Sequence, residues 1–271
     1  PSFEMIERFG GDIIQVPHLS PEFNIPWEKG KRMNIHGTDF LVPEDFSPVC
    51  REDGALELWE DGVVIARMPA EGYYFDCVSH PYQNIEETGE INELDIQPMP
   101  EREIAYVAKK AEKLYQDTDK ALMYYYPRKI FEDGIQKWGF ENFLAQMVSN
   151  EKMVHRYFER LTKVYLQDLE RILSRISPYV DLIRFVDDLG SQNAPMISTD
   201  MYRAMIKPYH EKIFGYVREH YPKVKVALHC CGSIKPLIND LISAGVQVLN
   251  PVQISAKDID PGELKEQFGK D

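Results

Sequence analysis

The sequence has few cysteines and no long apolar run. Four cysteines among 271 residues are too few for a disulfide framework, and each apolar run is far shorter than the roughly 20 residues of a membrane span. The first residues, Pro1 to Glu4, contain neither the basic nor the apolar segment of a secretory signal. We therefore expect a cytoplasmic protein without a membrane segment.

Positive charge is also scarce, since 31 Lys and Arg stand against 44 Asp and Glu, for a net charge of −13. A chain this acidic is a poor candidate for binding nucleic acid or an anionic membrane surface. Hydrophobic residues make up 44% of the chain, which is enough to bury a sizeable core. We expect a globular protein that acts on a small molecule, with a symmetric homodimer as the default assembly.

The first hundred residues predict short strands and irregular segments. Strand-like runs lie at 12–16, 55–60 and 63–67. Asp61-Gly62, between the last two runs, is a strong signal for a two-residue hairpin turn. Tyr73 to Phe75 predicts a further short strand, and residues 76–100 predict a long loop, which in a compact domain is usually functional or mobile.

From about residue 100 onward, helices alternate with strands. Apolar runs typical of buried parallel strands lie at 121–126, 180–186, 224–228 and 246–249. Helices are predicted after Pro100 and at 131–148, 150–176, 199–220 and 233–244. This order fits a TIM (β/α)8 barrel or a doubly wound sheet, and the absence of a Gly-rich dinucleotide fingerprint weakens the second alternative. We predict one α/β domain over 1–271, with a β-rich part at 1–100 and an alternating part at 101–271 that shows about half of a TIM barrel.

Active-site groups of a TIM barrel lie just past the carboxyl ends of its strands. Asp187 and Asp188 follow the predicted strand that ends at Val186, and Gln192 comes shortly after them. Two crowded carboxylates can hold a proton, a metal or a cationic group, and crowding raises one pKa so that this carboxyl can act as an acid. The alternative is that one aspartate caps a turn before Gly190 while the other is solvated.

A second cluster, His229-Cys230-Cys231, follows the next strand. In an extended segment His229 and Cys231 point to the same side and Cys230 points away. Imidazole and thiolate are preferred zinc ligands, and a catalytic zinc site needs three protein ligands and an open position, so a third ligand must come from elsewhere. The alternative is a buried histidine beside two small apolar cysteines.

Four further residues are candidates for substrate binding. Asn250 and Gln253, after the strand that ends at Leu249, could orient a polar substrate or satisfy backbone groups of their own loop. His80 in the predicted long loop could reach the mouth of the barrel, although a surface turn is the simpler alternative. Tyr125, in a run of three tyrosines, predicts core packing and a pocket wall.

Two blocks of the sequence resemble the uroporphyrinogen-decarboxylase superfamily. The first runs from Asp187-Asp-Leu-Gly-Ser-Gln192 to Lys207-Pro-Tyr209, and the second from His229-Cys-Cys-Gly-Ser-Ile-Lys-Pro-Leu237 to Gly245-Val-Gln-Val-Leu-Asn-Pro-Val-Gln253. The resemblance covers most of residues 1–260, and it implies a (β/α)8 barrel. Members usually extend further at both ends than this chain, so we expect its barrel to be incomplete at both ends.

The resemblance implies one of two chemistries. True decarboxylases strip acetate groups from a cyclic tetrapyrrole without a metal, and their Arg-rich N-terminal signature is not found here. The methyltransferase branch moves a methyl group between a corrinoid and a thiol or another acceptor, with His-x-Cys and a later Cys as zinc ligands. His229 and Cys231 match the first two ligands, and no cysteine follows Cys231. The third ligand is therefore expected beyond Asp271, or this member lacks it.

By this resemblance we expect a zinc-dependent methyltransferase that works with a corrinoid carried by a partner protein. Zinc held by His229 and Cys231 would activate the acceptor as a Lewis acid, while Asp187, Asp188 and Gln192 position it. The alternatives are a metal-free porphyrinogen decarboxylase and a non-catalytic module that binds a corrinoid or a tetrapyrrole.

Overall fold

The computed structural model describes residues 3–270 and divides into two compact units. Unit 1 comprises Pro1–Val16, Glu86–Asp133 and Ala145–Asp271, and unit 2 comprises Pro17–Ile85 and Gly134–Leu144. Most of the predicted β-rich part falls in unit 2, and most of the predicted alternating part falls in unit 1.

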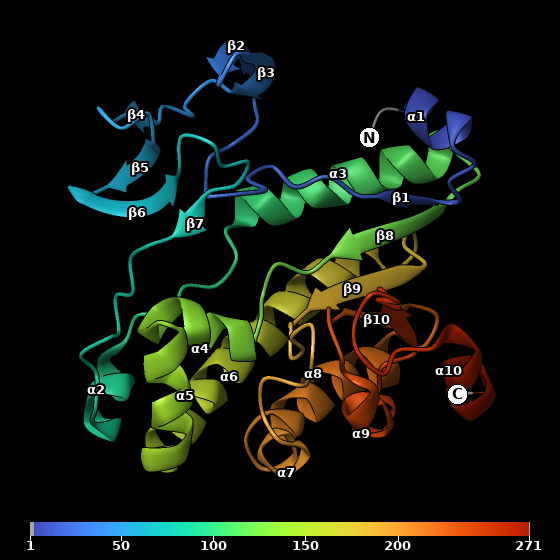
Figure 1. Cartoon of the computed structure of the whole chain (residues 1–271). Helices are drawn as coiled ribbons and strands as arrows, with labels where there is room; N and C mark the ends of the chain where they lie inside the picture. The colour runs from blue at the N-terminus through green and yellow to red at the C-terminus, as the bar shows by residue number, and fades with distance from the viewer. Residues whose placement is uncertain (1–2, 271) are drawn as a thin grey trace. The chain divides into compact units, whose positions relative to one another are not determined.

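Unit 1 is built on a sheet of five parallel strands that are arranged in chain order (Figure 1). They are β1 (Ile13–Gln15), β8 (Ala121–Tyr125), β9 (Leu182–Val186), β10 (Lys225–His229) and β11 (Val248–Asn250). A doubly wound sheet reverses its strand order at a switch point, whereas this sheet adds every strand beside the preceding one. The predicted α/β class with a parallel sheet is confirmed. Closure into a barrel is not, since β1 and β11 are the two edges of the sheet in residues 3–270.

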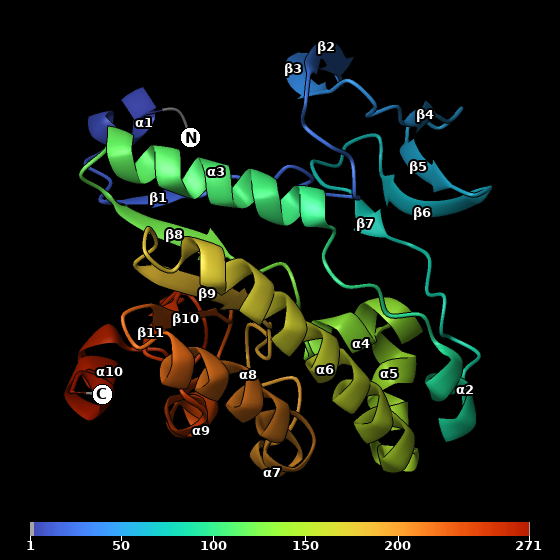
Figure 2. The same ribbon diagram turned by 180° about the vertical axis from the view of Figure 1, so that it is seen from behind.

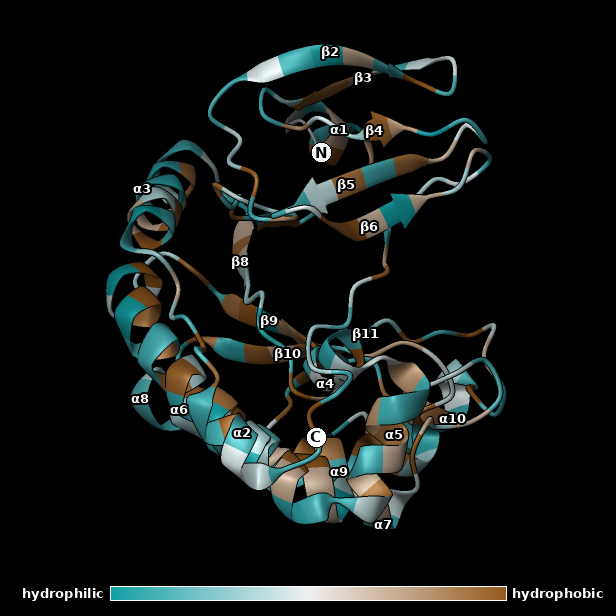
Figure 3. Ribbon diagram, turned by 90° about the vertical axis from the view of Figure 1, so that its left-hand side faces the viewer, coloured by the Kyte–Doolittle hydropathy of each residue, from teal (hydrophilic) through white to brown (hydrophobic). Residues whose placement is uncertain are grey.

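Three long helices cover one face of this sheet. α3 (Glu101–Asp117), α6 (Glu151–Ile176) and α8 (Lys207–His220) lie side by side in Figure 2, and α6 contacts both of the others. Buried residues recur along α6 at helical spacing, as in Tyr157, Leu161 and Tyr165. Figure 3 shows the matching alternation of hydrophobic and hydrophilic bands along the helices of unit 1.

Two predicted helices are interrupted. The segment predicted as one helix at 131–148 is α4 (Phe131–Trp138) and α5 (Phe140–Ser149), because Gly139 between them has a φ of +84°. This left-handed conformation ends a helix and suits glycine.

The segment predicted as a helix at 199–220 begins with a short α7 (Thr199–Met201) and a π-helical turn, Tyr202–Ile206. Ser198 caps this segment, since its hydroxyl accepts the N–H of Met201 at 3.1 Å. Pro208 lies in the first turn of α8, where a missing N–H costs no helical hydrogen bond.

The remaining elements of unit 1 are short. They are α1 (Phe3–Arg8), α2 (Thr88–Glu93), a 3₁₀ turn (Lys235–Leu237), α9 (Ile238–Ala244) and α10 (Pro261–Phe268). The presence of α2 corrects the prediction that 76–100 is entirely loop. Between residues 3 and 270, no helix combines the length and the apolar character that a membrane crossing needs.

Unit 2 contains two antiparallel sheets. One is the hairpin β2 (Gly30–Ile35) and β3 (Thr38–Pro43), and the other contains β4 (Val49–Cys50), β5 (Leu56–Glu60), β6 (Val63–Met68) and β7 (Asp76–Cys77). The predicted turn at Asp61-Gly62 is confirmed, since both residues have positive φ values, +49° and +80°. The strand predicted at Tyr73 to Phe75 is wrong, because the chain pairs only at the next two residues.

The tightly packed face of α6 predicts a large loss of stability when one of its side chains is shortened. Ile172 is fully buried there, so we expect Ile172→Ala to lower the free energy of unfolding by about 2–5 kcal/mol. Ile254 is 69% exposed in the same unit, and Ile254→Ala is expected to change stability by less than about 0.5 kcal/mol. Denaturant unfolding followed by circular dichroism measures both values, and equal losses would contradict the assigned packing.

Candidate functional site

Polar groups from three neighbouring strands of unit 1 meet at the carboxyl edge of the sheet. In the register of the sheet, His229 at the end of β10 lies beside Val186 of β9 and beside Asn250 of β11. Asp187 and Asp188 follow Val186 directly. The strand-end positions singled out in the sequence are therefore brought together by parallel pairing.

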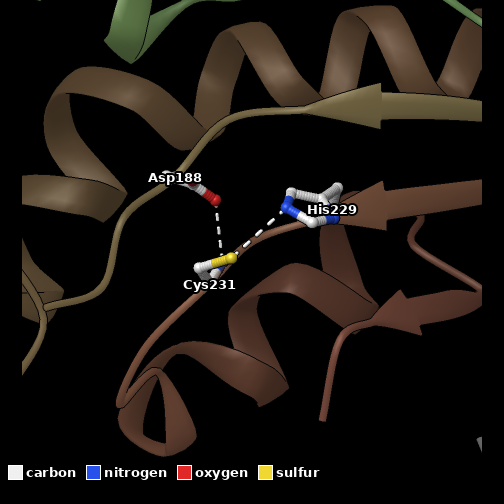
Figure 4. Close-up of side chains that lie close together, drawn as sticks. All are labelled: Asp188, His229 and Cys231. Carbon is white, nitrogen blue, oxygen red and sulfur yellow. Dashed lines mark hydrogen bonds between the residues drawn. The ribbon is translucent and has the colours of Figure 1, made fainter. Parts of the chain in front are cut away.

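Three potential metal ligands converge at this edge (Figure 4). Asp188, His229 and Cys231 each offer one ligand atom, and these atoms all lie within 4.8 Å of one another. The Sγ atom of Cys231 is 3.2 Å from Nε2 of His229. A nitrogen, a sulfur and a carboxylate oxygen are all donors that zinc accepts, and three protein ligands are the usual number in a catalytic zinc site.

Cys230 points away from this cluster, as the alternation of an extended chain predicts. Its side chain is fully buried, and its sulfur accepts the N–H of Leu189 at 3.3 Å. Burial raises the pKa of the Cys230 thiol, so that it stays protonated at neutral pH. The predicted orientation of Cys230 away from Cys231 agrees with the structure.

His229 is held in the tautomer that a metal ligand needs. Its Nδ1 atom lies 2.7 Å from Oδ1 of Asn250, and an amide oxygen can only accept a hydrogen bond. Nδ1 therefore carries the proton, which leaves a lone pair on Nε2. That lone pair faces the thiol of Cys231. Such an outer partner fixes both the tautomer and the ring orientation of a ligating histidine.

Asp188 is placed by main-chain hydrogen bonds on both sides. Its Oδ1 accepts the N–H of Cys231 at 2.7 Å, and its own N–H donates to Oε2 of Glu132 at 3.0 Å. No third ligand within the chain was predicted, because the resemblance pointed to a later cysteine. The structure instead brings a carboxylate from the neighbouring strand.

Negative charge accumulates around the three ligands. Burial raises the pKa of the Cys231 thiol, and the carboxylates of Asp188 and Glu132 raise it further. Burial also raises the pKa of Glu132, helped by Asp187 and opposed by Lys129, whose Nζ lies 2.8 Å from the Glu132 carboxylate. A site that resists further negative charge in this way stabilises a bound cation.

Asp187 has a different environment from Asp188. It is 2% exposed, and its carboxylate accepts the N–H groups of Ile130, Phe131 and Glu132 at 3.2, 2.9 and 2.9 Å. Nε2 of His210 lies 3.0 Å from the same carboxylate. Asp187 therefore anchors the first turn of α4, where a negative charge is favoured. This geometry gives Asp187 a positioning role, and its predicted catalytic role stays a prediction.

Gln192 and Gln253 connect the loops around the site. The side chain of Gln253 accepts the N–H of Gly232 at 2.8 Å and donates to Oε1 of Gln192 at 3.1 Å. Gln192 in turn donates to the carbonyl oxygen of Ser255. Both amides therefore satisfy polar groups of the surrounding loops, and roles for Gln192 and Gln253 in substrate binding stay predictions.

The other two predicted substrate-binding residues are Tyr125, in unit 1, and His80, in unit 2. Tyr125 ends β8 and pairs in register with Arg184, whose guanidinium carbon is 5.1 Å from the centre of its ring. His80 belongs to unit 2, where its Nδ1 is 2.9 Å from the carbonyl oxygen of Gln136. Roles for Tyr125 and His80 in substrate binding stay predictions.

Sequence reasoning missed three residues of the site: Lys129, Glu132 and His210. Lys129 and Glu132 follow strand β8, so the rule that selected the ends of the other strands could have found them. His210 lies in α8, and its Nδ1 is 3.1 Å from the hydroxyl of Tyr202. No local pattern in the sequence indicates that it would reach Asp187.

The segment that matches a family model includes the three potential ligands and most of the residues around them. Residues 130–260 match the model described as Uroporphyrinogen decarboxylase (URO-D). This match supports membership of the URO-D superfamily. Among curated proteins, none is significantly similar to it. URO-D proteins are decarboxylases or related methyltransferase-like enzymes, and the sequence resemblance is confirmed at this level.

The candidate site depends on two loops that pass very close to each other. A Cβ atom on Gly190 would overlap the carbonyl oxygen of Cys231. Gly232, with a φ of +89°, makes the reciprocal approach, since a Cβ there would overlap the carbonyl oxygen of Ser191. Glycine at both positions lets Asp188 and Cys231 come within ligand distance.

We expect Gly190→Ala to lower the free energy of unfolding by about 1–3 kcal/mol, because the added methyl group must push two backbone segments apart. Gly215 in α8 is the matched control, since a Cβ there meets nothing within 4 Å. Gly215→Ala should raise stability by about 0.5–1 kcal/mol. Denaturant unfolding distinguishes the opposite signs, and a neutral Gly190→Ala would show that the loops are not in close contact.

Proposed function

We propose that this chain is a zinc-dependent methyltransferase that moves a methyl group between a corrinoid and a thiol or another small acceptor. The observation that carries the proposal is the convergence of Asp188, His229 and Cys231, whose ligand atoms lie within 4.8 Å of one another. The corrinoid, expected on a partner protein, follows from the family resemblance alone.

The donor set suits zinc in number and in kind. Three protein ligands leave one position of a tetrahedral ion open for an acceptor. The chemistry supplied by zinc in such a position is a lower pKa for a bound thiol, which makes that thiol a nucleophile at neutral pH. The pKa of Cys231 is raised by burial and by nearby carboxylates, so binding a cation would relieve an unfavourable concentration of negative charge.

The residues around the ligands act by holding them in place. Asn250 orients the ring of His229 through Nδ1. Asp187 fixes the first turn of α4, and Glu132 in that turn accepts the N–H of Asp188. Ligand positions are thus set by neighbouring groups that do not themselves belong to the donor set, which is the usual arrangement around catalytic metals.

The charge at the site favours methyl transfer over decarboxylation of a porphyrinogen. A substrate with many carboxylates needs unpaired cations, but the two basic residues that follow β8 are already engaged. Arg128 lies 3.0 Å from the buried carboxylate of Asp168, and Lys129 lies 2.8 Å from Glu132. Asp187, Asp188 and Glu132 would repel further carboxylates at this edge of the sheet.

Metal analysis tests the proposed donor set. We expect inductively coupled plasma mass spectrometry to find about one zinc per chain in the wild type. Asp188→Ala, His229→Ala and Cys231→Ala should each lose most of it. Cys230→Ala is the matched control, since that sulfur points away from the cluster and zinc should be retained. Zinc that persists in the His229→Ala, Cys231→Ala double variant would exclude this site.

We expect a smaller loss of zinc affinity at Asn250, whose side chain contacts Nδ1 of His229 and not the ligating Nε2. Asn250→Ala should weaken zinc affinity by about 10- to 100-fold without abolishing binding, because the ring loses its fixed tautomer and orientation. Competition with a chromophoric chelator measures this affinity. Unchanged affinity would mean that the hydrogen bond does not orient a ligand.

Turnover separates the three functional alternatives. With methylcobalamin and 2-mercaptoethanol, methyl transfer forms a carbon–sulfur bond, releases the thiol proton, and leaves the electron pair of the broken cobalt–carbon bond on cob(I)alamin. The absorbance change that accompanies this loss of methylcobalamin should disappear in Cys231→Ala and persist in Cys230→Ala. Carbon dioxide release from uroporphyrinogen that is unaffected by Cys231→Ala would instead establish a metal-free decarboxylase. Cobalamin binding without turnover would establish a binding module.

A further inference from the structure

Unit 2 contains a cavity of about 980 Å³ that is lined by its own residues, all between Glu22 and Phe75. The hairpin β2–β3 and the segment after β6 contribute most of the lining. This volume is at the upper end of the range for small-molecule sites. The methyltransferase proposal makes no use of it.

The cavity is rich in aromatic rings. Six of its sixteen lining residues are aromatic: Phe23, Phe40, Phe46, Tyr73, Tyr74 and Phe75. The ring of Phe75 packs edge-on against Phe23 and Phe46, with centroids 6.1 and 5.9 Å apart. Tyr73 and Tyr74 are 89% and 81% exposed. Exposed aromatic side chains grouped around a cavity are unusual on a surface that binds nothing.

The charges in the lining have one sign at neutral pH. Glu22 and Glu71 supply carboxylates, and neither Lys nor Arg lines the cavity. Within residues 3–270, neither carboxylate side chain has an ion-pair or hydrogen-bond partner. Two unpaired carboxylates beside six aromatic rings produce a negative potential, since the face of an aromatic ring is itself electron-rich.

We propose that this cavity binds an organic cation with an apolar body, such as a quaternary ammonium compound. Aromatic faces attract a cation whose charge is shielded by methyl groups, and they bury its apolar surface at the same time. The carboxylates of Glu22 and Glu71 exclude the opposite class, anionic ligands such as phosphates and tetrapyrrole carboxylates. The proposal does not depend on the metal site, because no residue is shared between them.

The test compares two probes of almost equal shape. Choline carries a trimethylammonium group, and 3,3-dimethylbutan-1-ol replaces its nitrogen by carbon and is neutral. Ligand-observed NMR and calorimetry on the full chain should show choline binding about tenfold more tightly than the neutral probe. Neither probe interacts with zinc through an imidazole or a thiol, so failure here leaves the methyltransferase proposal standing.

Two variants locate the binding and two matched variants control for it. Glu71→Gln and a Tyr73→Leu, Tyr74→Leu double variant should each weaken choline binding by about five- to tenfold, and they should not change thermal unfolding because all three side chains are exposed. Glu60→Gln and Trp59→Leu remove the same kinds of group from exposed positions outside the cavity and should leave binding unchanged.

Several results would overturn the proposal. Equal affinity for the two probes would show an apolar cavity without charge preference. Choline binding that survives both cavity variants would place the cation elsewhere, and no binding at millimolar choline would exclude this class of ligand. Sedimentation that shows a dimer in the wild type and a monomer in the Tyr73→Leu, Tyr74→Leu variant would assign the cavity to a second copy of the chain.

Discussion

The parallel pairing of β9 with β10 is the interaction on which the candidate site depends. It places Val186 beside His229, so the residues that follow the two strands must leave the sheet at the same edge. Asp188 and Cys231 then come within hydrogen-bond distance through the N–H of Cys231. Without glycine at 190 and 232, the two loops could not pass at this separation. The strand register and the two glycines therefore bring Asp188 close to His229 and Cys231, which are more than forty residues away in sequence.

The three carboxylates near the crossing of these loops, Asp187, Asp188 and Glu132, have different roles although they lie close together. Asp187 is buried and holds the beginning of α4, Glu132 holds the backbone of Asp188, and Asp188 faces the imidazole and the thiol. The cost of burying Asp187 is offset by three N–H groups and His210. Two adjacent aspartates thus differ in role because successive residues of an extended segment point in opposite directions.

Much of unit 1 could be predicted from the sequence because its elements are long and periodic. The buried stripe of α6, the apolar strands and the polar strand ends were all visible, and so was the shared side of His229 and Cys231. Other features depend on tertiary contacts that no local pattern records. The break at Gly139, the source of a third ligand in Asp188 and the reach of His210 belong to this class. In unit 2, the hairpin β2–β3 escaped notice because no residue of β2 is fully buried and the first four residues of β3 are exposed, so neither strand has a clear apolar face.

The order of the strands has a consequence for how the chain folds. β8 to β11 follow one another with single crossovers, whereas β1 and its neighbour β8 are separated by more than a hundred residues that include most of unit 2. Pairing β1 with β8 closes this long segment, which costs more conformational entropy than forming any other strand pair of the sheet. We therefore expect β8 to β11 to pair first, while the other edge of β8 stays unpaired. β1 then joins β8 and completes the sheet last.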